Sequence, residues 1–471
     1  MKKDQRVRNI MANPAENNVK NESPMQENKM GVMPVGKLLF SMSLPIMISM
    51  LVQALYNVVD SMFVARVSEN ALTALSMAFP IQNLMIAVSA GLGVGLNAVL
   101  SRALGAKDEK GVNRAATNGI MLLFICGLIF MIGGVTIVRP YFEMQTDIEE
   151  IVKSGIDYTT IVMVGSMGVF MQILFERLLQ STGRTLLTMI SQGTGAIINI
   201  IFDPIFIFGL FGFPAMGVKG AAVATVIGQH TAMLASLLVF LLGKFAVRLD
   251  LRNFHFSWKM IRDIASIAIP NSCMNALGSV LVMGLNTILI GFSNTAVSLF
   301  GIYYKLQTFV FMPASGLTQG AMPIMGFSYG AGNGKRLQHT LSISLRVCFV
   351  IMAVGCVLFM AAPEWLLGLF DASEEMLAIG VPALRIISVS FLPAAIGFIL
   401  PTMFQAMGQG GYSLIVFLLR QLVITLPAAA ILSGPFGLTG IWASFILAES
   451  IAAGAALLFY NKLRKKDPVL G

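Results

Sequence analysis

Residues 38–64, LLFSMSLPIMISMLVQALYNVVDSMFV, decide the fold of this chain. A helix rises about 1.5 Å per residue, so this stretch reaches about 40 Å and can cross a bilayer core of about 30 Å. It contains one proline, Pro45, and one carboxylate, Asp60. An ionised Asp near the bilayer midplane costs at least about 2.5 kcal/mol, so Asp60 requires a partner, water or a function.

The composition of the whole chain is that of a membrane protein. Of its 471 residues, 56% are hydrophobic and only 12% are charged, which is too few charged side chains to cover a water-soluble globule of this size. The net charge of +9 is spread between apolar runs, so it indicates membrane orientation and not a nucleic-acid partner. The four cysteines lie inside apolar runs without CxxC spacing, which indicates neither a disulfide framework nor a zinc site.

Twelve apolar runs are long enough to span a membrane, and together they predict an all-α membrane protein with twelve transmembrane helices. The runs are residues 38–64, 71–101, 113–138, 155–180, 185–210, 217–243, 258–290, 294–327, 338–361, 378–406, 413–434 and 438–461. Most of the 32 lysines and arginines fall in segments on the same side as both chain ends. The positive-inside rule therefore predicts a multi-pass protein of the plasma membrane with both termini in the cytoplasm.

The chain also repeats itself at a fixed offset of 225 residues. The matched pairs are Pro45 and Pro270, Gln82 and Gln307, Gly91 and Gly316, Gly95 and Gly320, Gly105 and Gly330, Gln180 and Gln405, and Gly183 and Gly408. The offset covers six runs, an even number, so equivalent helices point the same way and the halves are parallel repeats related by an axis along the membrane normal.

The repeat divides the chain into two six-helix lobes. Residues 36–243 form the predicted N-lobe and residues 258–462 the predicted C-lobe, joined by a cytoplasmic linker over residues 244–257. Residues 1–35 are polar and lack an apolar core, so they predict a disordered cytoplasmic tail and no signal peptide. Residues 463–471 form a second cytoplasmic tail.

Two acids in the N-lobe are candidates for a cation site. Tyr56 lies one helical turn before Asp60, and Asn199 lies one turn before Asp203, so each pair shares a helix face at a similar depth. Carboxylates, a phenol and an amide oxygen could hold a proton or a hard cation, and Asp60 and Asp203 would be metal ligands only if that cation is Na⁺. The alternative is structural: Asp60 snorkels to outer water while Asp203 caps neighbouring backbone.

A third acid, Glu449, lies in the twelfth run at the same depth as Lys305 in the eighth run. We expect these two side chains to form a C-lobe ion pair, because an unpaired charge at that depth is costly. A role for Glu449 in binding substrate is the alternative. The sequence contains no nucleophile–base arrangement, so an enzyme is not expected, and neither is a cofactor beyond a coupling ion.

Four segments together resemble the multidrug and toxic compound extrusion (MATE) family: YNVVDSMFVA in the first run, GLNAVLSRALGA after the second, NIIFDPIFIFG in the fifth and QGAMPIMGFSYGAGN after the eighth. The resemblance covers the chain from about residue 36. It implies two lobes around a V-shaped cavity, alternating access, and export of organic cations or amphipathic drugs in exchange for H⁺ or Na⁺. We expect a monomer.

Within this family the chain is similar to the DinF-like branch, whose first-lobe cation site uses a Tyr–Asp pair in the first helix and an Asn–Asp pair in the fifth. Those positions fall here on Tyr56, Asp60, Asn199 and Asp203, and the resemblance implies that Thr225 supplies a hydroxyl from the sixth helix. The NorM-like branch has acids in its seventh and tenth helices, and the tenth run here has none.

Two other functions compete with drug export. A lipid-linked oligosaccharide flippase of the same broad superfamily should carry cationic residues along its central cavity, and the candidates in spans are Lys305, Arg385 and Arg420. A membrane receptor or scaffold would need neither two buried Asp residues nor a duplicated chain. A flux assay separates that case from both transporters.

Overall fold

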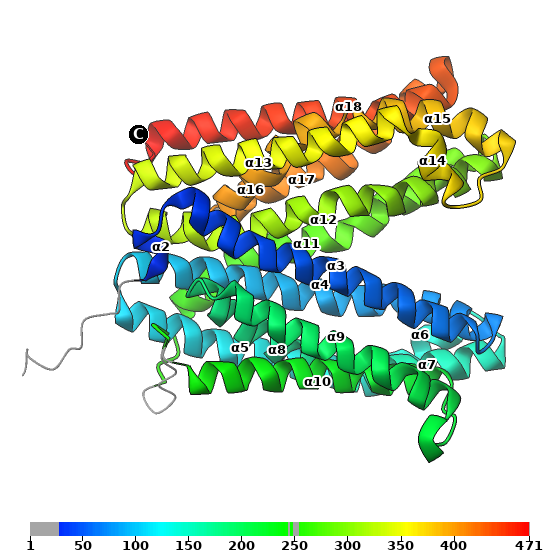
Figure 1. Cartoon of the computed structure of the whole chain (residues 1–471), viewed down its shortest axis with the longest axis horizontal. Helices are drawn as coiled ribbons and strands as arrows, with labels where there is room; N and C mark the ends of the chain where they lie inside the picture. The colour runs from blue at the N-terminus through cyan, green and yellow to red at the C-terminus, as the bar shows by residue number, and fades with distance from the viewer. Residues whose placement is uncertain (1–27, 244, 248–253, 471) are drawn as a thin grey trace, which may run out of the picture.

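The computed structural model describes residues 28–243, 245–247 and 254–470. The predicted linker over residues 244–257 lies partly outside these residues. The first repeat is built from these helices (Figure 1): α2 (Lys29–Val32), α3 (Val35–Ala65), α4 (Glu69–Gly105), α5 (Glu109–Thr136), α6 (Val138–Glu143), α7 (Glu149–Val164), α8 (Ser166–Ser181), α9 (Thr185–Phe208), η1 (Leu210–Gly212) and α10 (Val218–Leu242).

The second repeat follows the same plan. Its elements are α11 (Trp258–Leu289), α12 (Asn294–Gly330), α13 (Gly334–Ala361), α14 (Pro363–Gly368), α15 (Glu374–Ser388), α16 (Phe391–Ala406), α17 (Gly410–Leu418), η2 (Leu419–Val423) and α18 (Thr425–Lys466). The segment η2 is a turn of π-helix that contains Arg420, and it makes the backbone bulge at this residue.

Over the described residues these helices make twelve membrane spans, as the sequence predicts. Two spans are bent pairs: α7 and α8 meet at 41°, and α15 and α16 meet at 46°. The apolar stretch Gly410–Lys466 is 57 residues long, far more than one crossing needs, and it breaks at Gly437, where φ is 59°. Glycine permits this backbone, because it has no Cβ to clash in the left-handed region.

Glycine contacts between the lobes reproduce the sequence repeat in space. A Cβ added to Gly95 of α4 would come within 3.2 Å of Ala268 in α11, and one added to Gly320 of α12 would come within 2.7 Å of the Ser43 Cα in α3. Both members of each contact differ from their counterparts by 225 residues, so the contacts are related by the two-fold axis. Two further pairs of contacts obey the same rule: Gly91–Ser272 with Gly316–Met47, and Gly105–Phe327 with Gly330–Arg102.

Each lobe has its own hydrophobic core, but the first turns of α3 and α11 are exchanged. Leu39 of α3 packs in the core of the C-lobe, and Ile264 of α11 packs in the core of the N-lobe. The exchange occurs at the end of the molecule that carries both described chain ends, and the lobes diverge toward the opposite end (Figure 1).

Both predicted tails include folded residues. Most of the predicted N-terminal tail lies outside the described residues, but its last part forms α2 and is not disordered, since Met30 is fully buried. At the other end, Leu470 is also fully buried and its carbonyl accepts a hydrogen bond from Gln338 at 2.8 Å. Arg336 donates to the Met33 carbonyl at 2.7 Å, so α13 holds both chain ends.

Candidate functional site

The predicted N-lobe residues meet where α3 packs along α9. The Nδ2 of Asn199 donates to the Oδ1 of Asp203 at 3.3 Å, one turn further along α9. Asn199 is buried and Asp203 is completely buried. Asp60 of α3 is half-buried, and its charge acts on that of Asp203. The structure therefore brings the two carboxylates and the amide into one neighbourhood.

Three oxygen atoms of this group are buried and accept no hydrogen bond from the described residues: Asp60 Oδ1, Asp203 Oδ2 and Asn199 Oδ1. A buried acceptor without a donor costs about 1–3 kcal/mol, and more if it is charged. A proton would convert one carboxyl into a donor, and a hard cation would bind the oxygens directly. Among the described residues no group of three or more His, Cys, Asp or Glu side chains could hold a metal ion.

Thr225 lies at the level of this group on α10. Two glycines allow α9 and α10 to approach closely. A Cβ added to Gly220 would meet the backbone of Phe206, and one added to Gly228 would come within 3.0 Å of the Asn199 Cβ. Because Thr225 lies between these glycines and is buried, it is level with Asp203. The side chain of Tyr56 lies outside the described residues, so its place in the site stays a prediction.

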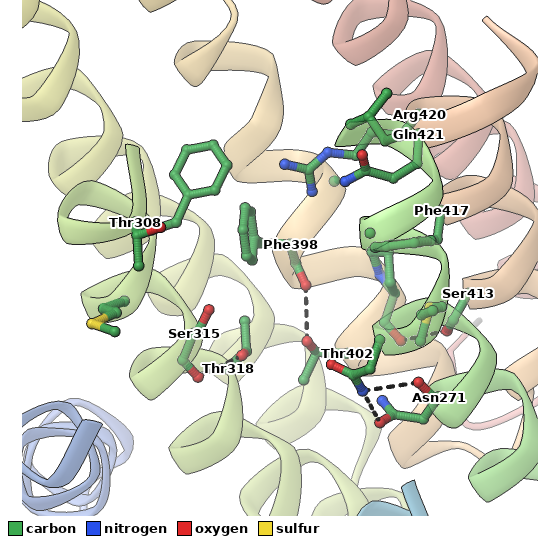
Figure 2. Close-up of a pocket in the computed structure, with 18 of the residues that line it drawn as sticks. Asn271, Thr308, Ser315, Thr318, Phe398, Thr402, Ser413, Phe417, Arg420 and Gln421 are labelled. Carbon is green, nitrogen blue, oxygen red and sulfur yellow. Dashed lines mark hydrogen bonds between the residues drawn. The ribbon is translucent and has the colours of Figure 1, made fainter. Parts of the chain in front are cut away.

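A cavity of about 640 Å³ lies between the lobes, beyond the glycine contacts. Figure 2 shows its polar wall, where Ser315 and Thr318 of α12 face Thr402 of α16 and Asn271 of α11. Phe398 extends the wall with an aromatic ring. The volume is that of a site for a drug-sized molecule, and the mixture of apolar walls with a few polar groups is typical of such sites.

The predicted ion pair between Lys305 and Glu449 is wrong. Glu449 pairs instead with Arg420, whose Nε lies 2.5 Å from Glu449 Oε1, and both side chains are buried. The guanidinium also lies over the ring of Phe398, 4.8 Å from its centre, and over that of Phe311 at 5.6 Å. Arg420 and Glu449 both line the cavity, so a molecule bound there can contact the pair even though little of either side chain is exposed.

Lys305 lines a second pocket of about 1000 Å³ between α4, α11 and α12. This side pocket shares four lining residues with the cavity, so the two spaces adjoin: Asn275, Gly278, Phe300 and Tyr304. No acid of the described chain forms an ion pair with Lys305.

Sequence reasoning missed two buried charges on α8. Glu176 accepts hydrogen bonds at 2.8 Å from Gln172 and from Gln192, and Arg177 lines the cavity. Both residues lie near the end of an apolar run, where a charge normally marks the membrane boundary. The glutamines around them are the signal that could have identified a buried polar cluster, because buried charges require hydrogen-bond partners.

Twelve spans in two repeats around a central cavity define a membrane transporter and not an enzyme. The family model MatE matches residues 45–205 and 270–431, one match in each repeat. The chain belongs to this family, the MATE transporters.

Named relatives and solved structures agree with this assignment. The chain is 27% identical to the multidrug export protein MepA of Staphylococcus saprophyticus over 425 residues, 90% of this chain and 93% of that protein. It is also 27% identical to MepA of Staphylococcus aureus over 438 residues, 92% of this chain and 95% of that one. A multidrug resistance MATE transporter in an outward-facing conformation superposes with a TM-score of 0.87 at 26% identity, covering 94% of this chain and 98% of its own.

A second solved structure that superposes on this chain is known for the polarity of its binding pocket. It is described as a transporter of the MOP superfamily from Pyrococcus furiosus whose pocket has reverse polarity, which suggests a different function for that protein. Its TM-score is 0.86 at 26% identity, over 94% of this chain and 99% of its own. Assignment of the present chain to the DinF-like branch stays a prediction.

Proposed function

We propose that this protein is a multidrug efflux transporter of the cell membrane that exports amphipathic small molecules in exchange for H⁺ or Na⁺. The observation that carries the proposal is the group of three unpartnered acceptor oxygens on Asp60, Asn199 and Asp203, which are buried within the N-lobe. Export by the relatives MepA supports the direction of transport. We further propose that both termini are cytoplasmic and that the monomer is the transporting unit.

The coupling follows from electrostatics in a medium of low dielectric constant. Two carboxylates that act on each other are costly when both are charged and buried, so a proton or Na⁺ arriving from outside relieves that cost. Moving one positive charge inward gains about 2.3 kcal/mol per 100 mV of membrane potential. Neutralised and charged forms of the site then favour different arrangements of the lobes, and substrate leaves in exchange.

Flux through reconstituted vesicles tests this proposal. Asp203→Asn and Asp60→Asn should each lower dye export driven by an imposed H⁺ or Na⁺ gradient by at least about tenfold, equivalent to about 1.4 kcal/mol. The gradient that drives the wild-type protein identifies the ion. Glu143→Gln is the matched control, because its carboxylate is 52% exposed and its ion-pair partner among the described residues is Arg139 at the surface. Full export by either Asp variant would refute the proposed coupling site.

A lipid-linked oligosaccharide flippase is the second candidate, since cations face the two pockets. Lys305 and Arg420 line them, as this function requires, whereas Arg385 is exposed and lines neither. A vesicle assay that follows a head-group-labelled prenyl pyrophosphate lipid separates the candidates. Movement of the lipid with no dye export would favour the flippase.

A further inference from the structure

The charges that face the two pockets do not balance. Among the described lining residues, the cations are Arg177, Arg420 and Lys305, and the acid is Glu449. Glu449 is already paired with Arg420. Two positive charges, those of Arg177 and Lys305, are therefore left without a carboxylate in contact.

Arg177 is held in place by neutral groups. Its Nη1 donates to Gln180 Oε1 at 2.6 Å and to Gln319 Oε1 at 3.1 Å, while its Nε has no hydrogen-bond partner in the part of the chain that the structure describes. The adjacent Glu176 is satisfied by Gln172 and Gln192 and forms no ion pair with Arg177 among the described residues. The side chain of Arg177 is thus a buried cation, 8% exposed, that amide oxygens orient. The charge of Glu176 offsets part of the charge of Arg177 without forming an ion pair with it among the described residues.

Lys305 is the second cation without a counter-charge. It faces the side pocket beside Asn286, whose buried Oδ1 also lacks a partner, and the pocket walls are otherwise largely apolar. The Lys305 side chain is exposed and lines this pocket, so an acidic group that enters the pocket can reach it. Because the side pocket adjoins the cavity, Lys305 and Arg177 line two spaces that meet.

The walls indicate the rest of the ligand. Phe300, Phe311 and Phe398 line the cavity together with four methionines, Met50, Met274, Met312 and Met322. Aromatic and thioether side chains accept apolar bodies of varied shape. A positive charge excess combined with these walls fits a molecule with an apolar body and an acidic group.

We propose that the cavity and its side pocket bind amphipathic organic anions. The acidic group of the ligand forms an ion pair with Arg177, and Lys305 attracts it in the side pocket. This inference rests on the proposed export function and narrows its substrate class, since it favours anions over the organic cations that the family resemblance implies. The acidic group is a carboxylate or a phosphate monoester, and it belongs to a soluble compound or to a lipid head group.

Equilibrium binding tests the proposal without any ion gradient. The full-length protein is placed in nanodiscs of uncharged phosphatidylcholine and titrated with three dansyl probes that share one alkyl chain and end in a carboxylate, an ammonium or a neutral amide. The carboxylate probe should bind at least about tenfold more tightly than the ammonium probe, and its affinity should fall as salt is added.

Substitutions then locate the anion. Arg177→Gln should lower the affinity for the carboxylate probe about tenfold and leave the affinity for the amide probe unchanged. Arg177→Lys should retain most of the affinity for the carboxylate probe. Lys305→Gln should lower that affinity by less than Arg177→Gln does. Lys335→Gln is the matched control, because Lys335 is exposed at the start of α13 and lines neither pocket. If Arg177→Gln does not fold, as judged by thermal unfolding, Lys305→Gln and the salt dependence of the wild-type protein carry the test.

Equal or tighter binding of the ammonium probe overturns the proposal, and so does a folded Arg177→Gln protein with unchanged carboxylate affinity. Displacement of the probe by decanoate but not by a prenyl phosphate identifies a soluble anion as the source, and the reverse result identifies a lipid. If the protein binds the anionic probe but an H⁺ or Na⁺ gradient drives no export, the proposed coupling mechanism is wrong and the inference about anion binding still holds.

Discussion

At the scale of single residues, the two lobes place their acids in opposite situations. Asp60 and Asp203 of the N-lobe have unpartnered oxygens and no cationic side chain in an ion pair with them among the described residues. Glu449 of the C-lobe also has one unpartnered oxygen among the described residues, Oε2, but its Oε1 lies 2.5 Å from the guanidinium of Arg420. An acid that lacks a fixed partner can take up and release a cation, whereas an acid paired with Arg420 is neutralised permanently. The lobes are therefore equivalent in fold but not in charge.

The buried pair predicts an asymmetric response to substitution. Glu449→Gln leaves the Arg420 guanidinium buried without a counter-charge and should destabilise the protein by about 3–5 kcal/mol, whereas the double variant Arg420→Gln/Glu449→Gln should lose less. Thermal unfolding in detergent measures both. Arg139→Gln, which breaks the exposed pair with Glu143 at 3.6 Å, should cost no more than about 1 kcal/mol. Equal losses for the single and double variants would show that the two charges do not interact.

At the scale of elements, close helix packing at one end holds the lobes together. The glycines of α4 and α12 lie against the first halves of α11 and α3, and no side chain larger than hydrogen fits at the tightest positions. Small residues at such crossings allow backbones to approach, which stabilises helix pairs in a membrane. These contacts close the chain-end side of the cavity, and alternating access requires that they separate.

Gly320→Ala should therefore shift the molecule toward the state that is open at this end. The added methyl group would come within 2.7 Å of the Ser43 Cα, which costs the closed contact about 1–3 kcal/mol. Spin labels on the exposed positions 107 and 335 would report a longer distance in the variant. Gly301→Ala, on the same helix with nothing within 4 Å, should leave the distance unchanged. A Gly320→Ala distance equal to that of the wild-type protein would contradict the proposed closure.

At the scale of the whole molecule, both described chain ends lie at the closed end (Figure 1), and residues farther along the same helices line the cavity. If that end is cytoplasmic, as the positive-inside rule predicts, the structure is the outward-facing state. In the proposed transport cycle this state opens the cavity to the outside, where substrate leaves.

Cysteine labelling in cells checks this orientation. With the four native cysteines replaced by alanine, Met144→Cys should react with a membrane-impermeant maleimide in intact cells, because Met144 is 87% exposed at the end opposite the chain ends. Lys335→Cys should react only after the membrane is permeabilised. The reverse labelling pattern would show that the chain ends lie outside the cell, and the structure would then be the inward-facing state.

Much of the fold could be predicted from local sequence. The length of each apolar run predicts a membrane span, because it depends only on neighbouring residues. The constant offset between matching residues predicts the repeats, because two segments of the sequence can be compared directly. The Asn199–Asp203 hydrogen bond could be predicted for the same reason, since residues four apart share a helix face. The bends between α7 and α8 and between α15 and α16 leave no comparable signal.

The sequence by itself therefore determined that this protein has twelve spans, two parallel repeats and a pair of acids in its first lobe. Only the tertiary structure decided that Arg420, and not Lys305, pairs with Glu449, and that Arg177 faces the cavity. Arg420 lies in the π-helical turn η2 and Glu449 lies beyond the break at Gly437, so irregular backbone precedes or contains both members of the pair. Depth along a helix can be counted from residue numbers, but the direction in which a side chain points across to another helix is fixed by packing.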